Sequence, residues 1–345
     1  MTVTKSVVAE FNDDDVELKV IEVELPKYGS SWVLIQVHAC ALVAAEDEKT
    51  QRSLLSNSSK ENNVLHIGQE IAGVVKAVGS DVFSVLPGDR VAGIVPLDYK
   101  QSGCSHYVLL QEFDIVPIRD SVSFVEASAT IGEAVKVYTS LHYLGRLNTS
   151  DTVLLIGGSV SIINMFIQLT HHWNARIIIA TANSSEAKQQ IDNEFLRLAS
   201  FIDVGWKELK SKVMFETGDL GADIIVNLMS SSKINVPSLH EVISCLSVGG
   251  RLISANPQLQ LDPPQSRQLM LRCASVGFLF DQAWNLSSAQ QGRYQHILMD
   301  IMEKVATGTV KPLIHKTVLK LDAACEALSE LKPNSVQGRV VLSLP

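Results

Sequence analysis

A pair of glycines directly after an apolar run is the feature of this sequence most able to support chemistry. Residues 153–156 (Val-Leu-Leu-Ile) read as a buried strand, and Gly157 and Gly158 follow it. A strand that turns through glycines into a helix can cradle a diphosphate, because glycine allows a tight turn and a close approach of the backbone to phosphate. Ser159 and Ser161 add two hydroxyl groups to the same turn. The spacing therefore suggests a dinucleotide-binding loop.

The second half of this loop departs from the expected pattern. Val160, Ser161 and Ile163 stand where further glycines would be needed. A β-branched side chain there fills space that the diphosphate would occupy, and it resists the backbone angles that glycine allows. Either the loop adapts, with Ser159 and Ser161 as phosphate ligands, or the pocket is closed and the domain is structural. The glycine losses favour the closed pocket.

Other chemistry is thinly represented in the sequence. No paired carboxylates, no Ser–His–Asp set and no reactive cysteine with a basic neighbour stand out, so no catalytic residue is assigned. The cysteines are far apart and none belongs to a C-x-x-C pair, which favours reduced thiols that fill space in the core. They are Cys40, Cys104, Cys245, Cys273 and Cys325.

Composition limits the possible partners and the compartment. The 345 residues include 37 acidic and 29 basic side chains, a net charge of −8, which argues against direct, sequence-blind binding to nucleic acid or anionic lipid. There is no uninterrupted apolar run of about 18 residues, so no membrane insertion is expected. The first 15 residues lack the apolar region of a secretory signal. We therefore expect a cytoplasmic protein.

The pattern of apolar residues changes near residue 123. Before it, short alternating runs between glycines and prolines predict strands at 33–38, 71–78, 90–95 and 106–110. After it, the pattern predicts strands at 152–156, 176–181, 223–226, 251–254 and 339–343, and helices at 162–172, 185–198, 236–246, 288–306 and 322–331. Regular alternation of strand and helix indicates a doubly wound parallel sheet. The proline-rich stretch at 256–267 is predicted to be a loop.

Residues 68–91 carry the most specific motif, GQEIAGVVKAVGSDVFSVLPGDRV. Its glycines, spaced around Glu70, resemble the medium-chain dehydrogenase/reductase superfamily, as do the segments at 216–227 and 246–256. The resemblance implies an α/β fold made of a GroES-like β-rich domain and a Rossmann domain. The implied division is a GroES-like N-terminal domain at 1–122, a Rossmann nucleotide-binding-like domain at 123–280, and a C-terminal return at 281–345 that completes the GroES-like domain.

The resemblance also bears on metal binding. Zinc-dependent members of the superfamily place a cysteine and a histidine at the positions that correspond to Val43 and Gln69 here. Valine has no donor atom, and a neutral amide oxygen is a poor zinc ligand compared with thiolate or imidazole. The four-cysteine structural zinc lobe is missing as well. The chain therefore resembles the zinc-free quinone oxidoreductase (ζ-crystallin) branch, and no metal site is expected.

Enzymes of that branch take hydride from a nicotinamide cofactor. The end of the second Rossmann strand, at 177–188, lacks the acidic residue that grips the adenosine ribose of NAD. Ser184 and Lys188 lie where NADPH-preferring quinone reductases contact the 2′-phosphate, although Lys188 could equally be a solvated helix residue. If a dinucleotide binds, the resemblance implies NADPH, held by Gly157, Gly158, Ser159, Ser161 and Lys188.

The run at 261–294 resembles a narrower subgroup, the quinone oxidoreductase-like (ζ-crystallin-like) proteins. Members of this subgroup look like subunits of the FERRY assembly, which attaches to early endosomes through a small GTPase and carries messenger RNA. The resemblance implies a catalytically weak or inactive scaffold subunit with protein partners, peripheral to early endosomes. The alternative is a zinc-independent, NADPH-dependent reductase of quinones or enones.

A homodimer is the expected assembly. Quinone reductases commonly join their Rossmann sheets edge to edge, and residues 274–280 are apolar enough to form the pairing strand. The alternative is an internal edge strand without a partner. Because the net charge is acidic, we expect any RNA to be held by other subunits.

Overall fold

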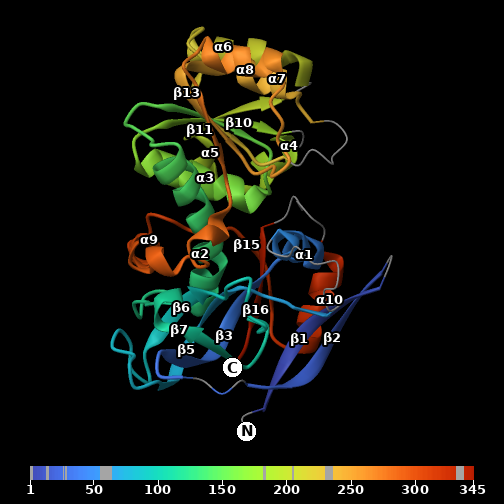
Figure 1. The fold of residues 1–345 in the computed structure, drawn as a ribbon, viewed down its shortest axis with the longest axis vertical. Helices are drawn as coiled ribbons and strands as arrows, with labels where there is room; N and C mark the ends of the chain where they lie inside the picture. Colours follow the sequence, from blue (N-terminus) through green and yellow to red (C-terminus); the bar gives the residue numbers. More distant parts are fainter. Residues whose placement is uncertain are drawn as a thin grey trace. The chain divides into compact units, whose positions relative to one another are not determined.

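The computed structural model describes residues 3–12, 15–25, 27, 29–54, 64–181, 184–203, 206–229, 236–331 and 338–345. It divides into two compact units, the first made of residues 1–135 and 282–345 and the second of residues 136–281 (Figure 1). Helix α2 (Phe124–Tyr138) begins in the first unit and ends in the second. The predicted division at residue 122 assigns this whole helix to the Rossmann domain.

The first unit is built on a seven-stranded sheet of order β15-β16-β3-β5-β6-β8, with β7 paired to β3, and on a smaller sheet of order β2-β1-β4. Its strands are β1 (Val3–Asn12), β2 (Asp15–Glu24), β3 (Trp32–Leu42), β4 (Val64–His66), β5 (Glu70–Val78), β6 (Arg90–Ile94), β7 (Tyr107–Gln111), β8 (Ile115–Pro117), β15 (Ile314–Val318) and β16 (Arg339–Ser343). Its helices besides α2 are α1 (Ala45–Ser53), α9 (Gln291–Ala306) and α10 (Leu321–Glu330). The hairpin of β1 and β2 is absent from the predicted elements.

Strand β3 positions the core of the first unit. Its side chains alternate between half-buried and buried along the first eight residues. This alternation places Val33, Ile35 and Val37 on one face, where they pack with Ile71 of β5 and Leu342 of β16 in a single apolar core. Helix α10 packs against β1 and β2. The last strand of the chain is thus built into the same core as the first ones.

The second unit contains a six-stranded parallel sheet of order β11-β10-β9-β12-β13-β14. Its strands are β9 (Thr152–Ile156), β10 (Arg176–Thr181), β11 (Ala199–Asp203), β12 (Ala222–Asn227), β13 (Leu246–Ser254) and β14 (Ser275–Phe278). Its helices are α3 (Val160–His172), α4 (Ser184–Gln190), α5 (Asn193–Leu196), α6 (Leu209–Thr217), α7 (Leu239–Ser244) and α8 (Pro263–Met270). In Figure 1, α6, α7 and α8 lie on one side of these strands and α3 on the other. The predicted fold class, a β-rich domain with a doubly wound Rossmann domain, is confirmed.

Two predicted helices of the second unit were wrong in extent. The helix predicted at 185–198 is divided into α4 and α5, because the backbone of Asp192 is extended with a ψ of 139°. The helix predicted at 236–246 covers only α7. Ser238 begins it with a capping box that includes Glu241, and Leu246 already belongs to β13.

The predicted loop at 256–267 was also wrong at its C-terminal end. Helix α8 begins at Pro263, after Asp262 in an extended conformation. Proline is tolerated in the first turn of a helix, because the backbone N–H groups there have no intrahelical partner. None of the helices in the described ranges combines the length and the apolar character that a bilayer crossing requires.

Gly73→Ala tests how closely β3 and β5 approach each other. A methyl group at position 73 would collide with the backbone oxygen of Gln36 on β3. We therefore expect the substitution to lower the free energy of unfolding by about 1 to 3 kcal/mol. Gly292→Ala is the matched control, because the position is helical and an added methyl group there meets no atom within 4 Å apart from the adjoining residues and the backbone of its own helix. Urea unfolding followed by circular dichroism measures both, and equal losses in the two variants would contradict the close approach.

Candidate functional site

The two predicted loop glycines form the turn at the carboxyl end of β9. Gly157 and Gly158 have φ angles of +75° and +103°, a region that favours glycine. The N–H of Gly157 donates to the carbonyl of Ala180 at the end of β10, at 3.0 Å. A Cβ atom at Gly157 would lie 2.5 Å from Cγ of Met229, and one at Gly158 would lie 2.8 Å from Cγ2 of Ile162. Both glycines are therefore required by the packing of the protein itself.

The serines of the loop are engaged with the start of α3. Ser159 is the N-cap residue, and its Oγ accepts a hydrogen bond from the N–H of Ile162 at 3.4 Å. The hydroxyl groups of Ser159 and Ser161 lie 3.2 Å apart and bond to each other. The structure thus brings Gly157, Gly158, Ser159 and Ser161 together in one turn, as predicted from the spacing. One of the helix N-terminal N–H groups that an anion would use is already satisfied by the cap.

The residues that replace glycine in this loop are buried. Val160 is 2% exposed, Ile163 is 1% exposed and Ser161 is 4% exposed. The side chain of Ile162 fills the space beside Gly158. Helix α3 is buried at every position from Val160 to Thr170. The first turn of α3 therefore carries buried side chains at the positions where glycine was expected.

Lys188 lies in α4, on the β11 side of the sheet. Its ammonium nitrogen is 5.3 Å from the centre of the Phe201 ring on β11. This is a cation–π contact, so Lys188 has a packing role in this fold. The side chain of Ser184, the other predicted phosphate contact, lies outside the described residues.

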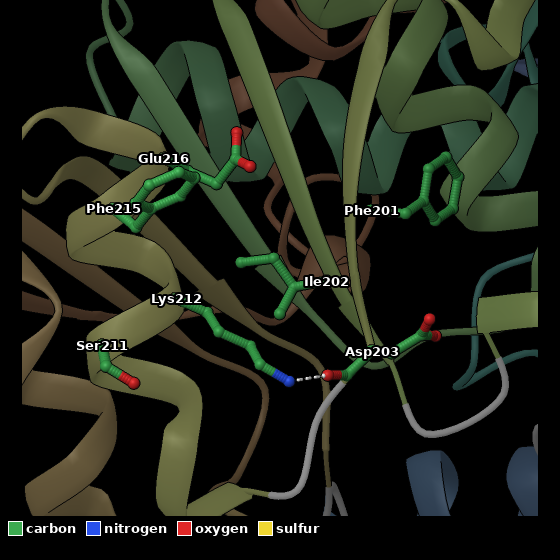
Figure 2. Close-up of a pocket in the computed structure, with 7 residues that line it drawn as sticks. All are labelled: Phe201, Ile202, Asp203, Ser211, Lys212, Phe215 and Glu216. Carbon is green, nitrogen blue, oxygen red and sulfur yellow. Dashed lines mark hydrogen bonds between the residues drawn. The ribbon is translucent and has the colours of Figure 1, made fainter.

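A pocket of about 370 Å³ lies between β11 and α6 (Figure 2). Its lining residues are Phe201, Ile202, Asp203, Ser211, Lys212, Phe215 and Glu216. Figure 2 shows the ammonium of Lys212 directed at the backbone carbonyl of Asp203, to which it donates at 2.5 Å. Glu216 pairs with Arg176 at 2.7 Å. None of the five predicted cofactor residues lines this pocket.

Val43 and Gln69, the positions that correspond to zinc ligands in the zinc-dependent members, lie in the first unit at the end of β3 and the start of β5. Val43 follows β3, and Gln69 directly precedes β5. The amide oxygen of Gln69 accepts a hydrogen bond from Nε2 of Gln282 at 3.1 Å. The oxygen of Gln282 accepts one from Nδ2 of Asn285, also at 3.1 Å. A chain of three neutral amides, those of Gln69, Gln282 and Asn285, therefore lies at the start of β5.

Two family models match the chain. The model described as alcohol dehydrogenase GroES-like domain matches residues 29–130, and the one described as zinc-binding dehydrogenase matches residues 186–342. The chain is 36% identical over 305 residues to Quinone oxidoreductase-like protein 1 of Mus musculus, which covers 85% of this chain and 86% of that protein. The chain belongs to the quinone oxidoreductase-like proteins of the medium-chain dehydrogenase/reductase superfamily.

More distant members of the superfamily share the fold over the whole length. The chain is 23% identical over 342 residues to Quinone oxidoreductase of Rattus norvegicus, covering 98% of this chain and 96% of that protein. The crystal structure of a putative NADPH:quinone reductase from Bacillus thuringiensis superposes with a TM-score of 0.79 at 19% identity, covering 99% of both chains. At that identity the likeness shows the fold alone.

Zinc is implied by the name of one family model, but the residues of this quinone oxidoreductase-like chain do not fit it. Val43 offers no donor atom, and the amide oxygen of Gln69 already accepts the Gln282 hydrogen bond. Amide oxygen is also a poor zinc ligand compared with thiolate or imidazole. Within the described ranges, no three His, Cys, Asp or Glu side chains are grouped so that they could hold a metal ion.

Members of the superfamily typically bind NAD(P)H, and here the loop fits such a cofactor only in part. The turn at Gly157 and Gly158 has the required backbone conformation. The following residues, Val160 to Ile163, carry buried side chains where a diphosphate loop has further glycines.

Glu48 of α1 is a buried acid beside the amide chain, and no sequence signal identified it. Its Oε1 accepts a hydrogen bond from the N–H of Gly68 at 2.9 Å. The side chain is 1% exposed, and this burial raises the pKa of the Glu48 carboxyl from 4.5 to about 7, against the opposing effects of the Gly68 N–H and of Arg52. The contact between Gln69 and Gln282 also lacks a sequence signal, because the two residues are 213 positions apart in the chain.

The raised pKa of Glu48 predicts a pH-dependent stability. The folded protein holds the proton more tightly than the unfolded chain, so this contribution is full below pH 4.5 and is lost as the pH rises through about 7. Glu48→Gln cannot ionise, so its free energy of unfolding relative to the natural chain should rise by about 1 to 3 kcal/mol between pH 5 and pH 8. Urea unfolding at the two pH values measures the difference. Glu17→Gln, whose natural side chain is 62% exposed, is the control; an identical pH profile in both variants would refute the burial of a proton at Glu48.

Proposed function

We propose that this quinone oxidoreductase-like protein is a catalytically weak or inactive scaffold subunit that acts as a dimer. The start of α3 is the observation that carries the proposal. There Ser159 caps its own helix, Ile162 packs over Gly158, and Val160 is buried. In this proposal the side chains of the first turn of α3 close the diphosphate crevice, and the domain retains the fold as a surface for assembly.

The second part of the proposal concerns the partners. We propose that the scaffold joins an endosomal assembly of the FERRY kind that links messenger RNA to early endosomes. The resemblance of residues 261–294 to the quinone oxidoreductase-like subgroup supports this, as does the 36% identity to Quinone oxidoreductase-like protein 1. The net charge of −8 favours protein partners over direct contact with RNA.

The proposed dimer contact is the outer edge of β14. This strand pairs with β13 on one side only and ends the order of the parallel sheet. Ser275 and Phe278 are exposed, Phe278 by 55%. An edge strand presents a row of backbone N–H and C=O groups that a second copy can pair with. A two-fold axis across β14 would join the two sheets into one.

The alternative function is an NADPH-dependent, zinc-independent reductase of quinones or enones. One observation favours it, namely that Gly157 and Gly158 both adopt the left-handed conformation that a diphosphate turn requires. In such an enzyme the bound nicotinamide would supply the hydride, and the protein would mainly orient the two reactants. Gly157, Gly158, Ser159, Ser161 and Lys188 would hold the cofactor.

A thermal-shift titration with NADPH and with NADH separates the two functions. A ligand at 100 times its dissociation constant stabilises a protein by about 2.7 kcal/mol, which a melting curve resolves. We expect no saturable rise in Tm at millimolar nucleotide, because buried side chains stand in the first turn of α3 where a diphosphate loop has glycine. The putative NADPH:quinone reductase from Bacillus thuringiensis is titrated in parallel in the same assay. A saturable rise in Tm with NADPH that Lys188→Ala weakens would favour the alternative function, an NADPH-dependent reductase.

The dimer contact is tested by placing a charge on β14. Phe278→Lys puts an ammonium group on the proposed pairing edge, where two copies would face each other, so we expect it to convert a dimer to a monomer. Phe215→Lys is the matched control, because Phe215 is 85% exposed on α6, a helix that contacts β11 at the opposite end of the sheet from β14. Light scattering coupled to size-exclusion chromatography gives the mass of each variant. A monomeric natural chain, or dissociation by the control alone, would rule out this contact.

A further inference from the structure

Two cysteines that are 64 residues apart in sequence meet in the core of the first unit. Cys40 lies on β3, and Cys104 lies in the segment before β7. Their sulfur atoms are 3.6 Å apart, and both residues are 0% exposed. The thiol of Cys104 donates to the sulfur of Cys40, and the thiol of Cys40 donates to the carbonyl of Ala41 at 3.6 Å. The spacing along the chain gave no hint of this pair.

The surrounding backbone leaves the two sulfur atoms little freedom to separate. Gly68, with a φ of +91°, lies against both, since a Cβ atom there would be 2.7 Å from the Cys104 sulfur and 2.8 Å from the Cys40 sulfur. A Cβ atom at Gly103 would be 3.1 Å from the Cys40 sulfur. Only glycine at these two positions leaves room for the thiols, and the same two residues limit the directions in which the thiols can turn.

Hydrogen bonds of the backbone hold the segment that contains Cys104 in place. The N–H of Gly103 donates to the carbonyl of Gly68 at 2.8 Å, and the N–H of Val7 donates to the carbonyl of Cys104 at 2.9 Å. Ser105 forms a β-bridge with Ser6. The Cys104 segment is therefore fixed on both sides, and a bond between the sulfur atoms needs a shift of the side chains rather than a rearrangement of the chain. A disulfide has an S–S length of about 2.05 Å, so the two atoms must approach by about 1.5 Å.

We propose that Cys40 and Cys104 form an oxidisable dithiol, which hydrogen peroxide converts to an intramolecular disulfide. One thiolate attacks the peroxide O–O bond and becomes a sulfenic acid, with release of hydroxide. The sulfur of the second cysteine then attacks the sulfenic sulfur, the S–O bond breaks, and the oxygen leaves as water. In total, two thiols and one hydrogen peroxide give one disulfide and two waters. The peroxide is the oxidant, and the two sulfur atoms together lose two electrons.

The site makes this reaction slow. The hydrogen bond from Cys104 and burial raise the pKa of the Cys40 thiol well above its ordinary value, so little thiolate is present at neutral pH. The exposed Cys273 should react with peroxide sooner. The rate of disulfide formation should increase with pH, because the thiolate is the reacting form. This chemistry takes place in the first unit and does not depend on whether the Rossmann unit binds a nucleotide.

The disulfide would clamp β3 to the Cys104 segment directly beneath Gly68 and Gln69. Closing a loop of this length restricts the unfolded chain, which raises the stability of the folded protein. The oxidised protein should therefore melt several degrees above the reduced one, and dithiothreitol should reverse the shift.

The test uses the full chain carrying Cys273→Ser, which removes the exposed thiol. The folded protein is treated with hydrogen peroxide at pH 8.5, blocked with N-ethylmaleimide in guanidinium, and digested with trypsin. Cleavage after Lys and Arg places Cys40 in the peptide 28–49 and Cys104 in the peptide 101–119, each with a single cysteine. We expect a cross-linked species of these two peptides, two hydrogens lighter than their sum, that dithiothreitol releases.

The controls make the outcome decisive. Cys40→Ala must abolish the cross-link, and the buried Cys245, which has no neighbouring thiol partner among the described residues, should be recovered fully alkylated. A Tm that rises on oxidation and returns with dithiothreitol gives a second readout that needs no variant. Recovery of both peptides as N-ethylmaleimide adducts or as sulfinic acids, with no cross-link, would overturn the proposal.

Discussion

The buried charge of Arg339 is the constraint on which the first unit depends. Its guanidinium pairs with the carboxylate of Glu70 and lies 3.8 Å from that of Glu133. The three side chains are only 10%, 12% and 9% exposed, in that order. A buried charge that loses its partner costs about 3 to 5 kcal/mol, so β5, α2 and β16 cannot separate without a large penalty. Gly132 permits the contact, because a Cβ atom there would strike the Glu70 side chain.

The position of Glu70 determines what lies beside it. Gly68 and Gln69 immediately precede it, and their groups are directed to Glu48 and Gln282. The C-terminal return is therefore attached to the start of β5 at two points, through Gln282 and through Arg339. Neutral amides offer a cation no negative charge, and burial raises the pKa of the neighbouring Glu48 carboxyl to about 7, which disfavours its charged form. The same turn at Gly68 encloses the two thiols.

The sequence predicted the architecture because the architecture depends on local periodicity. Strands such as β9 and β10 were predicted to the residue, since continuous apolar runs between turn residues are typical of buried parallel strands. The break at Asp192 was missed because the residues on both sides favour helix. The start of α8 at Pro263 was missed because proline was interpreted as a loop signal, although it is equally at home in a first turn.

The candidate site was predictable only where its residues are neighbours in sequence. Gly157, Gly158, Ser159 and Ser161 form one turn, so their spacing alone placed them together. The contacts of Gln69 with Gln282, and of Cys40 with Cys104, join segments that only the completed fold brings together. No periodicity or motif spans such distances. Long-range side-chain contacts of this kind become visible only when burial and side-chain partners are known.

The two loop glycines are weaker evidence for a nucleotide than their pattern suggests. Gly157 is required by Met229 and Gly158 by Ile162, so packing alone would retain both after a cofactor was lost. Positions 160 and 163 are more informative. In a nucleotide-binding loop, glycine at such positions allows the close approach of phosphate and the packing of helix on strand. Val160 and Ile163 carry β-branched side chains at these positions and are themselves buried. The side chains at positions 160 and 163 therefore carry more information about function than Gly157 and Gly158.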